Sequence, residues 1–138
     1  MKYKHKIAHM KAAFVYAECS TAERLKVGCV IVKDHRIISI GYNGMPSGWN
    51  NVCETSDNVT KPEVLHAESN AIAKLARSNE SGEGAVAFVT HQPCMDCAKL
   101  LYQSGIVRVY YVHPYRLNDG LKFLTTSGIE VEQMTVDR

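Results

Sequence analysis

The chain has 138 residues, a length that suits a single domain, residues 1–138, with a buried core. Its net charge of +2 gives no generally basic surface, which argues against a nucleic-acid partner. No segment has the apolar length of a membrane span or the core of a signal peptide, so we expect no membrane partner. An odd number of cysteines favours a reducing compartment, and we expect a cytoplasmic protein.

The first predicted elements are a helix and a β-hairpin. Apolar side chains recur at helical spacing from Ile7 to Phe14, which predicts a helix over residues 7–18. Two apolar, β-branched runs follow at residues 27–32 and 37–40, and the polar turn between them predicts a hairpin. Because both faces of these strands are apolar, helices should cover the sheet on each side.

A glycine-rich run, residues 41–48 (GYNGMPSG), follows the hairpin and has the composition of a turn or loop. It fits a plain loop that leaves a strand, and equally a loop whose backbone approaches a ligand closely, which glycine permits. Residues 49–62 are polar and irregular, and loops of this length are usually functional or mobile. Trp49 either anchors a surface or packs this loop down.

From His66 onward the pattern alternates between helix and strand. We predict helix 63–78 entered at His66, strand 85–90, a helix from Cys94 to about residue 103, strand 106–112, helix 120–126 and strand 129–133. Such alternation predicts parallel strands joined by helical crossovers. The predicted fold class is therefore α/β, a three-layer α/β/α sandwich around a five-stranded mixed sheet. Ligands of open α/β sheets bind at the edge where strands end and helices begin.

Four residues at that edge carry the clearest chemical signal. His66, Cys94 and Cys97 are three potential zinc ligands, and three protein ligands leave a fourth tetrahedral position for water, as in catalytic zinc sites. A helix start at the two cysteines would lower the pKa of their thiols and favour metal binding. Glu68 lies close enough in sequence to handle the protons of that water. A Cys-x-x-Cys pair alone also fits a redox or structural zinc motif, so the prediction needs all four residues.

Four runs of sequence make the chain resemble the cytidine-deaminase superfamily, and more narrowly its deoxycytidylate deaminases. They are residues 27–32 (VGCVIV), 41–48 (GYNGMPSG), 66–72 (HAESNAI) and 92–100 (QPCMDCAKL). The His-x-Glu and Pro-Cys-x-x-Cys elements form the general zinc-deaminase signature. The glycine-rich run is similar to the corresponding run in the deoxycytidylate deaminases. The resemblance covers residues 19–131 and implies a cytidine-deaminase-like fold with one catalytic Zn²⁺ per chain.

The resemblance also implies an activity, a set of partners and several site residues. The activity is hydrolytic deamination of dCMP to dUMP with release of ammonia, which supplies dUMP for dTMP synthesis. The implied assembly is a homo-hexamer activated by dCTP and inhibited by dTTP, with Mg²⁺ accompanying the allosteric nucleotide. Glu68 would be the catalytic acid–base group, and it would contact the substrate together with His66 and Ala67. Asn43 would hold the deoxyribose hydroxyl, and Tyr115 would reach the substrate phosphate or sugar.

A nucleotide phosphate needs charge-assisted hydrogen-bond donors. Arg24 and Lys26 precede the first strand and are the nearest cations in sequence to the predicted site. Arginine offers a bidentate fork for such an anion. These two residues either bind a phosphate, of the substrate or of an allosteric nucleotide, or are ordinary surface cations. The candidate allosteric or phosphate-binding positions are Arg24, Lys26, Gly41, Tyr42, Asn43 and Gly44.

Three cysteines lie outside the zinc motif. Some members of the superfamily carry a second, structural zinc, and Cys19 and Cys53 lie roughly where its cysteine ligands fall. No histidine lies between Arg36 and His66, so we expect no second zinc and treat both cysteines as free thiols. Cys29, inside a predicted strand, should be a small core residue.

Two alternative functions remain open from the sequence. The chain could be a deaminase of another cytosine nucleoside or of tRNA adenosine, although the low net charge and the glycine-rich run argue against these substrates. It could also be a non-catalytic module that binds zinc or nucleotides. The intact Glu68 argues against a module without catalysis.

Overall fold

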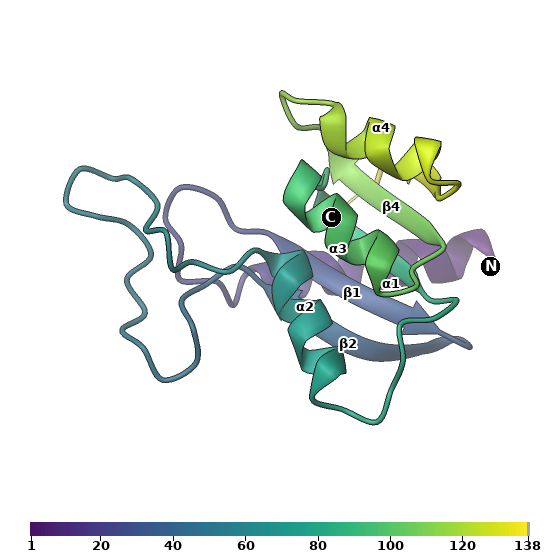
Figure 1. Ribbon diagram of the computed structural model, residues 1–138, viewed down its shortest axis with the longest axis horizontal. Coiled ribbons are helices and arrows are strands. Elements are labelled where there is room, and N and C mark those ends of the chain that lie inside the picture. The colour runs from purple at the N-terminus through teal and green to yellow at the C-terminus, as the bar shows by residue number, and fades with distance from the viewer. Residues whose placement is uncertain (138) are drawn as a thin grey trace.

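The computed structural model describes residues 1–137, with helices and strands in the predicted order (Figure 1). The elements are α1 (Tyr3–Ala17), β1 (Gly28–Lys33), β2 (Arg36–Tyr42), α2 (Ala67–Ala76), β3 (Val86–His91), α3 (Met95–Gln103), β4 (Arg108–His113), α4 (Asp119–Thr126) and β5 (Glu130–Gln133). No helix in this part of the chain combines the length and the apolar character needed to cross a membrane.

The strands form one mixed sheet in the order β2-β1-β3-β4-β5. β1 pairs antiparallel with both β2 and β3, whereas β3, β4 and β5 are parallel. Helix α3 connects β3 to β4 and helix α4 connects β4 to β5, as parallel neighbours require. The predicted five-stranded mixed sheet with parallel strands in its second half is confirmed.

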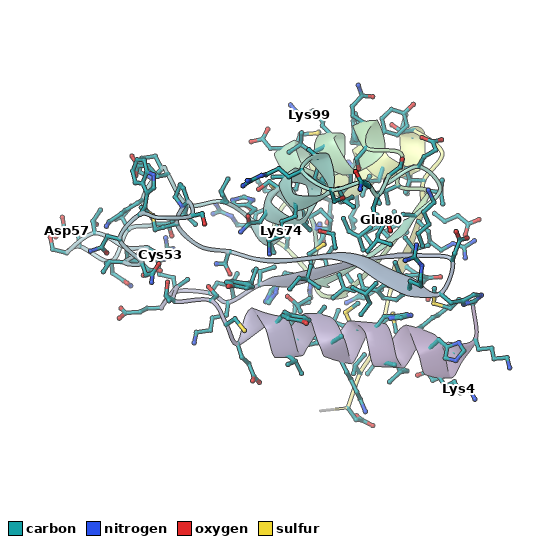
Figure 2. The ribbon with its side chains drawn as sticks, turned by 90° about the horizontal axis from the view of Figure 1, so that it is seen from below. Lys4, Cys53, Asp57, Lys74, Glu80 and Lys99 are labelled. Carbon is teal, nitrogen blue, oxygen red and sulfur yellow. The ribbon has the colours of Figure 1, made fainter. Side chains whose placement is uncertain are left out.

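Helices cover both faces of this sheet. Figure 2 shows α1 on one face and the other three helices on the opposite face. Met10 and Phe14 of α1 pack with Val30 and Phe88 of the sheet in one buried cluster. A second buried cluster joins α2, α3 and α4 to the other face. The predicted three-layer α/β/α sandwich is therefore confirmed.

Some boundaries differ from those predicted. Helix α1 begins at Tyr3 rather than residue 7, because its first turn has no apolar periodicity to reveal it. Strand β2 continues through Gly41 and Tyr42, which we had assigned to a loop. Both residues pair with β1, and a Cβ at Gly41 would collide with the carbonyl oxygen of Ala67 in α2. Close helix packing therefore accounts for this glycine.

The segment between β2 and α2 extends away from the three layers, at the left of Figure 1. Its two ends meet in an isolated bridge between Gly44 and Leu65. Within it, residues 53–61 form a small hairpin, closed by a bridge between Glu54 and Thr60 and by a bond of 2.8 Å from the Lys61 N–H to the Cys53 carbonyl. We call residues 53–61 the loop hairpin. The predicted long irregular loop is thus present, with a folded portion of its own.

Candidate active site

Two helix starts bring the predicted zinc ligands together. His66 is the N-cap of α2 and Cys94 is the N-cap of α3, and both have extended backbone angles that turn the chain into the helix. Cys97 follows in the first turn of α3 and is buried. The structure therefore joins residues from separate parts of the sequence at the edge of the sheet where β3 ends.

The donor atoms fit a tetrahedral zinc ion. His66 Nδ1 lies 3.3 Å from Cys97 Sγ and 3.6 Å from Cys94 Sγ, and all three donor atoms lie within 4.8 Å of one another. Zinc–sulfur and zinc–nitrogen bonds of about 2.3 and 2.0 Å at a tetrahedral angle would separate sulfur and nitrogen by about 3.5 Å. One nitrogen and two sulfur donors suit Zn²⁺, and the three residues leave room for a fourth ligand.

The three donors influence one another's protonation. Hydrogen bonds from Cys97 and His66 lower the pKa of the Cys94 thiol to about 4, so this sulfur is readily a thiolate. The pKa of Cys97 is raised, first by its hydrogen bond to Cys94 and then by burial. The hydrogen bond to Cys94 raises the pKa of His66. The hydrogen bonds within the cluster thus favour a thiolate at Cys94 beside His66.

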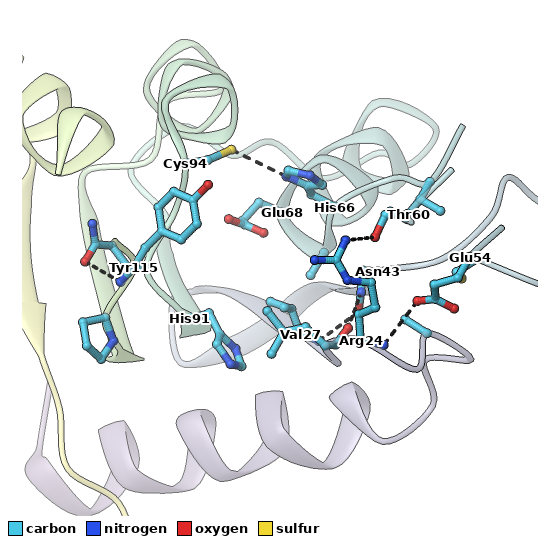
Figure 3. Close-up of a pocket in the computed structure, with 17 residues that line it drawn as sticks. Arg24, Val27, Asn43, Glu54, Thr60, His66, Glu68, His91, Cys94 and Tyr115 are labelled. Atoms are coloured by element: carbon cyan, nitrogen blue, oxygen red, sulfur yellow. Dashed lines mark hydrogen bonds between the residues drawn. The ribbon is translucent and has the colours of Figure 1, made fainter. Parts of the chain in front are cut away.

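Glu68 stands in the first turn of α2, and Figure 3 shows it directed into the pocket beside His66 and Cys94. Its side chain is only 4% exposed. Burial raises the pKa of this carboxyl to about 7, against the opposing effect of its backbone hydrogen bond. A carboxyl group with a pKa near neutrality can both accept and donate a proton, which is the requirement for a general acid–base group.

A pocket of about 560 Å³ opens in front of this cluster. Its size suits a small organic ligand. The predicted site residues that line it are Arg24, Asn43, His66, Ala67, Glu68, Cys94 and Tyr115. Lys26, Gly41, Tyr42 and Gly44 are not among its lining residues. The structure therefore brings the proposed catalytic and substrate-binding residues around one cavity.

Asn43 lines this pocket, and its side chain forms hydrogen bonds with two backbone groups. Its Oδ1 accepts the Val27 N–H at 2.8 Å, and its Nδ2 donates to the Leu25 carbonyl at 2.7 Å. These bonds hold the segment between α1 and β1 against the end of β2. One amide N–H and one oxygen lone pair remain for a ligand, since a primary amide has two donors and two acceptor sites.

Arg24 reaches the same pocket from that segment. Its Nη1 donates to Thr60 Oγ1 at 3.3 Å. The backbone N–H groups of Glu23 and Arg24 both donate to Glu54 Oε2, at 3.1 and 3.3 Å. Glu54 and Thr60 belong to the loop hairpin and line the pocket, and the sequence analysis did not identify either. Only their position in a long loop hinted at a role.

Gln92 is a third residue that the sequence analysis missed. It is 5% exposed, and its side-chain amide donates to the Leu117 carbonyl at 2.8 Å and accepts the Tyr115 N–H at 3.1 Å. These bonds hold the loop after β4, and this loop places Tyr115 at the pocket. Gln92 lies in the run of residues 92–100 that carries the family resemblance. No spacing rule predicts which backbone groups its amide will bond to.

His91, at the end of β3, also lines the pocket without having been predicted. Burial, and then the neighbouring His113, lower the pKa of His91 to about 4, so its imidazole is neutral at neutral pH. Its Nδ1 lies 2.7 Å from Thr90 Oγ1, which also accepts the Gly28 N–H. His91 therefore offers the pocket a hydrogen-bonding ring without a charge.

The remaining cysteines lie outside the donor cluster. Cys29 is fully buried in β1, as predicted for a small core residue, and burial raises the pKa of its thiol. Cys53 is buried in the loop hairpin and Cys19 is exposed. Among residues 1–137, the cluster of possible metal ligands that the structure reveals is His66, Cys94 and Cys97. The expectation of a single zinc stays a prediction.

Comparison with known proteins gives this site a family. ComE operon protein 2 of Bacillus subtilis is 34% identical over 134 residues, which cover 93% of this chain and 70% of that protein. Deoxycytidylate deaminase of Enterobacteria phage T4 is 34% identical and covers 88% of this chain, which spans 86% of that protein. Deoxycytidylate deaminase of Saccharomyces cerevisiae is 35% identical, but this chain spans only 43% of its length.

A solved structure extends the likeness to three dimensions. The crystal structure of dCMP deaminase from the cyanophage S-TIM5, in complex with dCMP and dUMP, superimposes with a TM-score of 0.95 at 47% identity. The match covers 97% of this chain and 99% of that chain. A family model for the cytidine and deoxycytidylate deaminase zinc-binding region matches residues 3–113. The fold, the donor cluster and this match together show that the chain belongs to the cytidine and deoxycytidylate deaminase family.

Proposed function

We propose that this enzyme deaminates dCMP hydrolytically to dUMP and ammonia. The observation that carries the proposal is one pocket lined by His66, Cys94 and the buried Glu68 and also by Arg24, with Cys97 completing the donor cluster. The donor cluster and Glu68 suit the base of a nucleotide, and the Arg24 guanidinium suits its phosphate. The likeness to deoxycytidylate deaminases of phages and to the cyanophage enzyme bound to dCMP and dUMP supports this substrate.

Zinc held by His66, Cys94 and Cys97 would supply acidity, because it lowers the pKa of a water in its open position towards neutrality. Glu68 accepts one proton from the attacking water and delivers it to ring N3, and then moves the second proton from the new C4 hydroxyl group to the leaving amine. The water oxygen bonds to C4, the bond from C4 to the amine breaks, and ammonia leaves. A carboxyl with a pKa of about 7 suits both directions of proton transfer.

The rest of the pocket would hold the nucleotide. Asn43 binds the deoxyribose hydroxyl through the amide N–H and lone pair that its backbone contacts leave free. Arg24 binds the 5′-phosphate with charge-assisted hydrogen bonds. Tyr115 reaches the phosphate or the sugar from the loop after β4. His66 and Ala67 contact the base. Lys26 lies outside the pocket lining, so Arg24 is the better of the two candidate cations.

The assembly and its regulation are proposed on the family resemblance. The enzyme would be a cytoplasmic homo-hexamer, activated by dCTP and inhibited by dTTP, with Mg²⁺ bound to the effector nucleotide. Tyr42 and Gly44, together with Lys26, would belong to the regulatory site rather than to the substrate pocket, whereas the packing of α2 accounts for Gly41. Ammonia release measured with and without dCTP and dTTP tests regulation, and light scattering tests the hexamer.

A competition assay tests the proposed substrate. Ammonia release would be measured with dCMP, deoxycytidine, CMP and an adenosine-containing tRNA anticodon stem-loop at equal concentrations. We expect the highest kcat/KM with dCMP. A higher kcat/KM with deoxycytidine or tRNA would replace the proposal with one of the alternative deaminases, and zinc binding without turnover of any substrate would favour a non-catalytic module.

A further inference from the structure

The segment that carries Arg24 has no regular secondary structure of its own. Residues 18–27 connect α1 to β1 through turns and bends. A guanidinium on such a segment has many accessible positions, and holding it in one of them costs conformational entropy. The orientation of Arg24 must therefore come from contacts with other parts of the chain.

The loop hairpin supplies these contacts at two points. Glu54 Oε2 accepts the N–H groups of Glu23 and Arg24, at 3.1 and 3.3 Å, and fixes the backbone. Thr60 Oγ1 accepts a hydrogen bond of 3.3 Å from Arg24 Nη1 and fixes the end of the side chain. Glu54 and Thr60 face each other across the bridge that closes the hairpin, so one small unit sets both ends of Arg24.

The charges are arranged to leave the guanidinium available. Glu54 is 7% exposed, and a buried carboxylate is tolerated when it accepts hydrogen bonds. Its acceptor oxygen bonds to backbone N–H groups, and among residues 1–137 no carboxylate lies within 4.0 Å of the Arg24 guanidinium. Thr60, a neutral hydroxyl, orients Arg24 without neutralising it. The cation therefore remains free to pair with an anion in the pocket.

We propose that Glu54 and Thr60 are positioning residues that aim Arg24 at the 5′-phosphate, so that the loop hairpin sets the preference for a nucleoside monophosphate over a nucleoside. The inference rests on the proposed function, because it takes Arg24 as the phosphate ligand. It implies that Glu54, which is negatively charged, strengthens the binding of the negatively charged 5′-phosphate. Simple electrostatics predicts the opposite sign, since removal of Glu54 should then tighten phosphate binding.

Steady-state kinetics with dCMP and deoxycytidine show whether removal of Glu54 weakens or tightens phosphate binding. For Glu54→Ala we expect the KM for dCMP to rise about tenfold with little change in kcat, the loss that corresponds to one or two net hydrogen bonds. The kinetics with deoxycytidine should stay unchanged, because this substrate has no phosphate. Glu54→Gln keeps an acceptor oxygen and should restore most of the affinity. Thr60→Val should raise the KM for dCMP about threefold, as expected for one net hydrogen bond.

The chain offers a matched control for charge. Asp57 lies at the exposed tip of the same hairpin and has no hydrogen bond or ion pair to Arg24. Asp57→Asn removes one negative charge, as Glu54→Gln does, and should behave like the wild type. Zinc content measured for every variant excludes damage to the metal cluster.

A double-mutant cycle shows whether Glu54 acts through Arg24. Arg24→Ala should raise the KM for dCMP at least as much as Glu54→Ala does. The double variant should have a KM for dCMP no higher than that of Arg24→Ala alone. Amide hydrogen exchange gives a readout without turnover. The N–H groups of Glu23 and Arg24 should exchange faster in Glu54→Ala than in the wild type or in Asp57→Asn.

Three results would overturn the inference while leaving the proposed function intact. They are an unchanged or lower KM for dCMP in Glu54→Ala, equal losses of kcat/KM with dCMP and with deoxycytidine, or additive rises in KM in the Arg24 and Glu54 cycle. If Glu54→Ala fails to fold, Thr60→Val in the same cycle with Arg24→Ala still decides, because it is expected to raise the KM for dCMP about threefold. A wild-type enzyme that shows no preference for dCMP over deoxycytidine would refute the phosphate role in the proposed function, and the inference with it.

Discussion

Gln92→Met removes the side-chain amide that holds the loop after β4 while keeping a side chain of similar length. The amide makes two hydrogen bonds of ordinary length, at 2.8 Å to the Leu117 carbonyl and 3.1 Å from the Tyr115 N–H, and a weaker one of 3.4 Å to Asn118 Oδ1. At about 1 kcal/mol net for each ordinary bond, we expect a loss of about 2 kcal/mol of stability. For a chain of 138 residues this corresponds to a fall in Tm of about 7 °C.

The same substitution should affect substrate binding, because the loop presents Tyr115 to the pocket. We expect a higher KM for dCMP with unchanged zinc content, measured beside thermal unfolding by circular dichroism. Gln103→Met is the matched control, since Gln103 is exposed at the end of α3 and should tolerate the change. A Tm within about 1 °C of the wild type, together with an unchanged KM, would refute the role assigned to Gln92.

Three further predictions concern the metal, the packing of α1 and the cations. Purified protein should contain one zinc per chain, and Cys97→Ala should lower zinc content and ammonia release in parallel, whereas two zincs per chain by elemental analysis would show that other cysteines bind metal. Gly28→Ala should lose about 3 kcal/mol of stability in urea unfolding, because its Cβ would collide with the backbone carbonyl of Ala13, and a loss below about 1 kcal/mol would contradict this packing. Lys26→Ala should leave the KM for dCMP unchanged while Arg24→Ala raises it, and equal effects would show that both cations serve the pocket.

The fold and the grouping of the candidate zinc ligands could be predicted from the sequence, for identifiable reasons. Apolar runs and turn residues define the strands and helices locally, so the order of elements and the mixed sheet followed from them. His66, Cys94 and Cys97 could be grouped because each lies at a helix start that follows the same edge of the sheet. The structure also confirms the burial of Cys29.

The rest of the site depends on tertiary contacts that have no local signal. Glu54 and Thr60 lie in a polar loop in which no motif or periodicity distinguishes them from the other polar residues. Only the folded hairpin brings them to Arg24. Gln92 acts through backbone groups that are more than twenty residues away in sequence. Gly41 looked like a loop glycine, whereas contact with α2 explains it, because periodicity does not report the distance between a helix and a strand.

The central claim is that Glu68 moves protons in a zinc-dependent deamination of dCMP. The most direct test is the rate of ammonia release from dCMP by wild type and Glu68→Gln, with zinc content and dCMP binding measured on both proteins. Glutamine keeps the shape and hydrogen bonding of the side chain but cannot accept a proton. This role of Glu68 predicts equal zinc content and retained dCMP binding, with turnover reduced about 10²–10⁴-fold. A Glu68→Gln variant that retains more than about a tenth of the wild-type rate would contradict it, because a general acid–base group contributes far more than that.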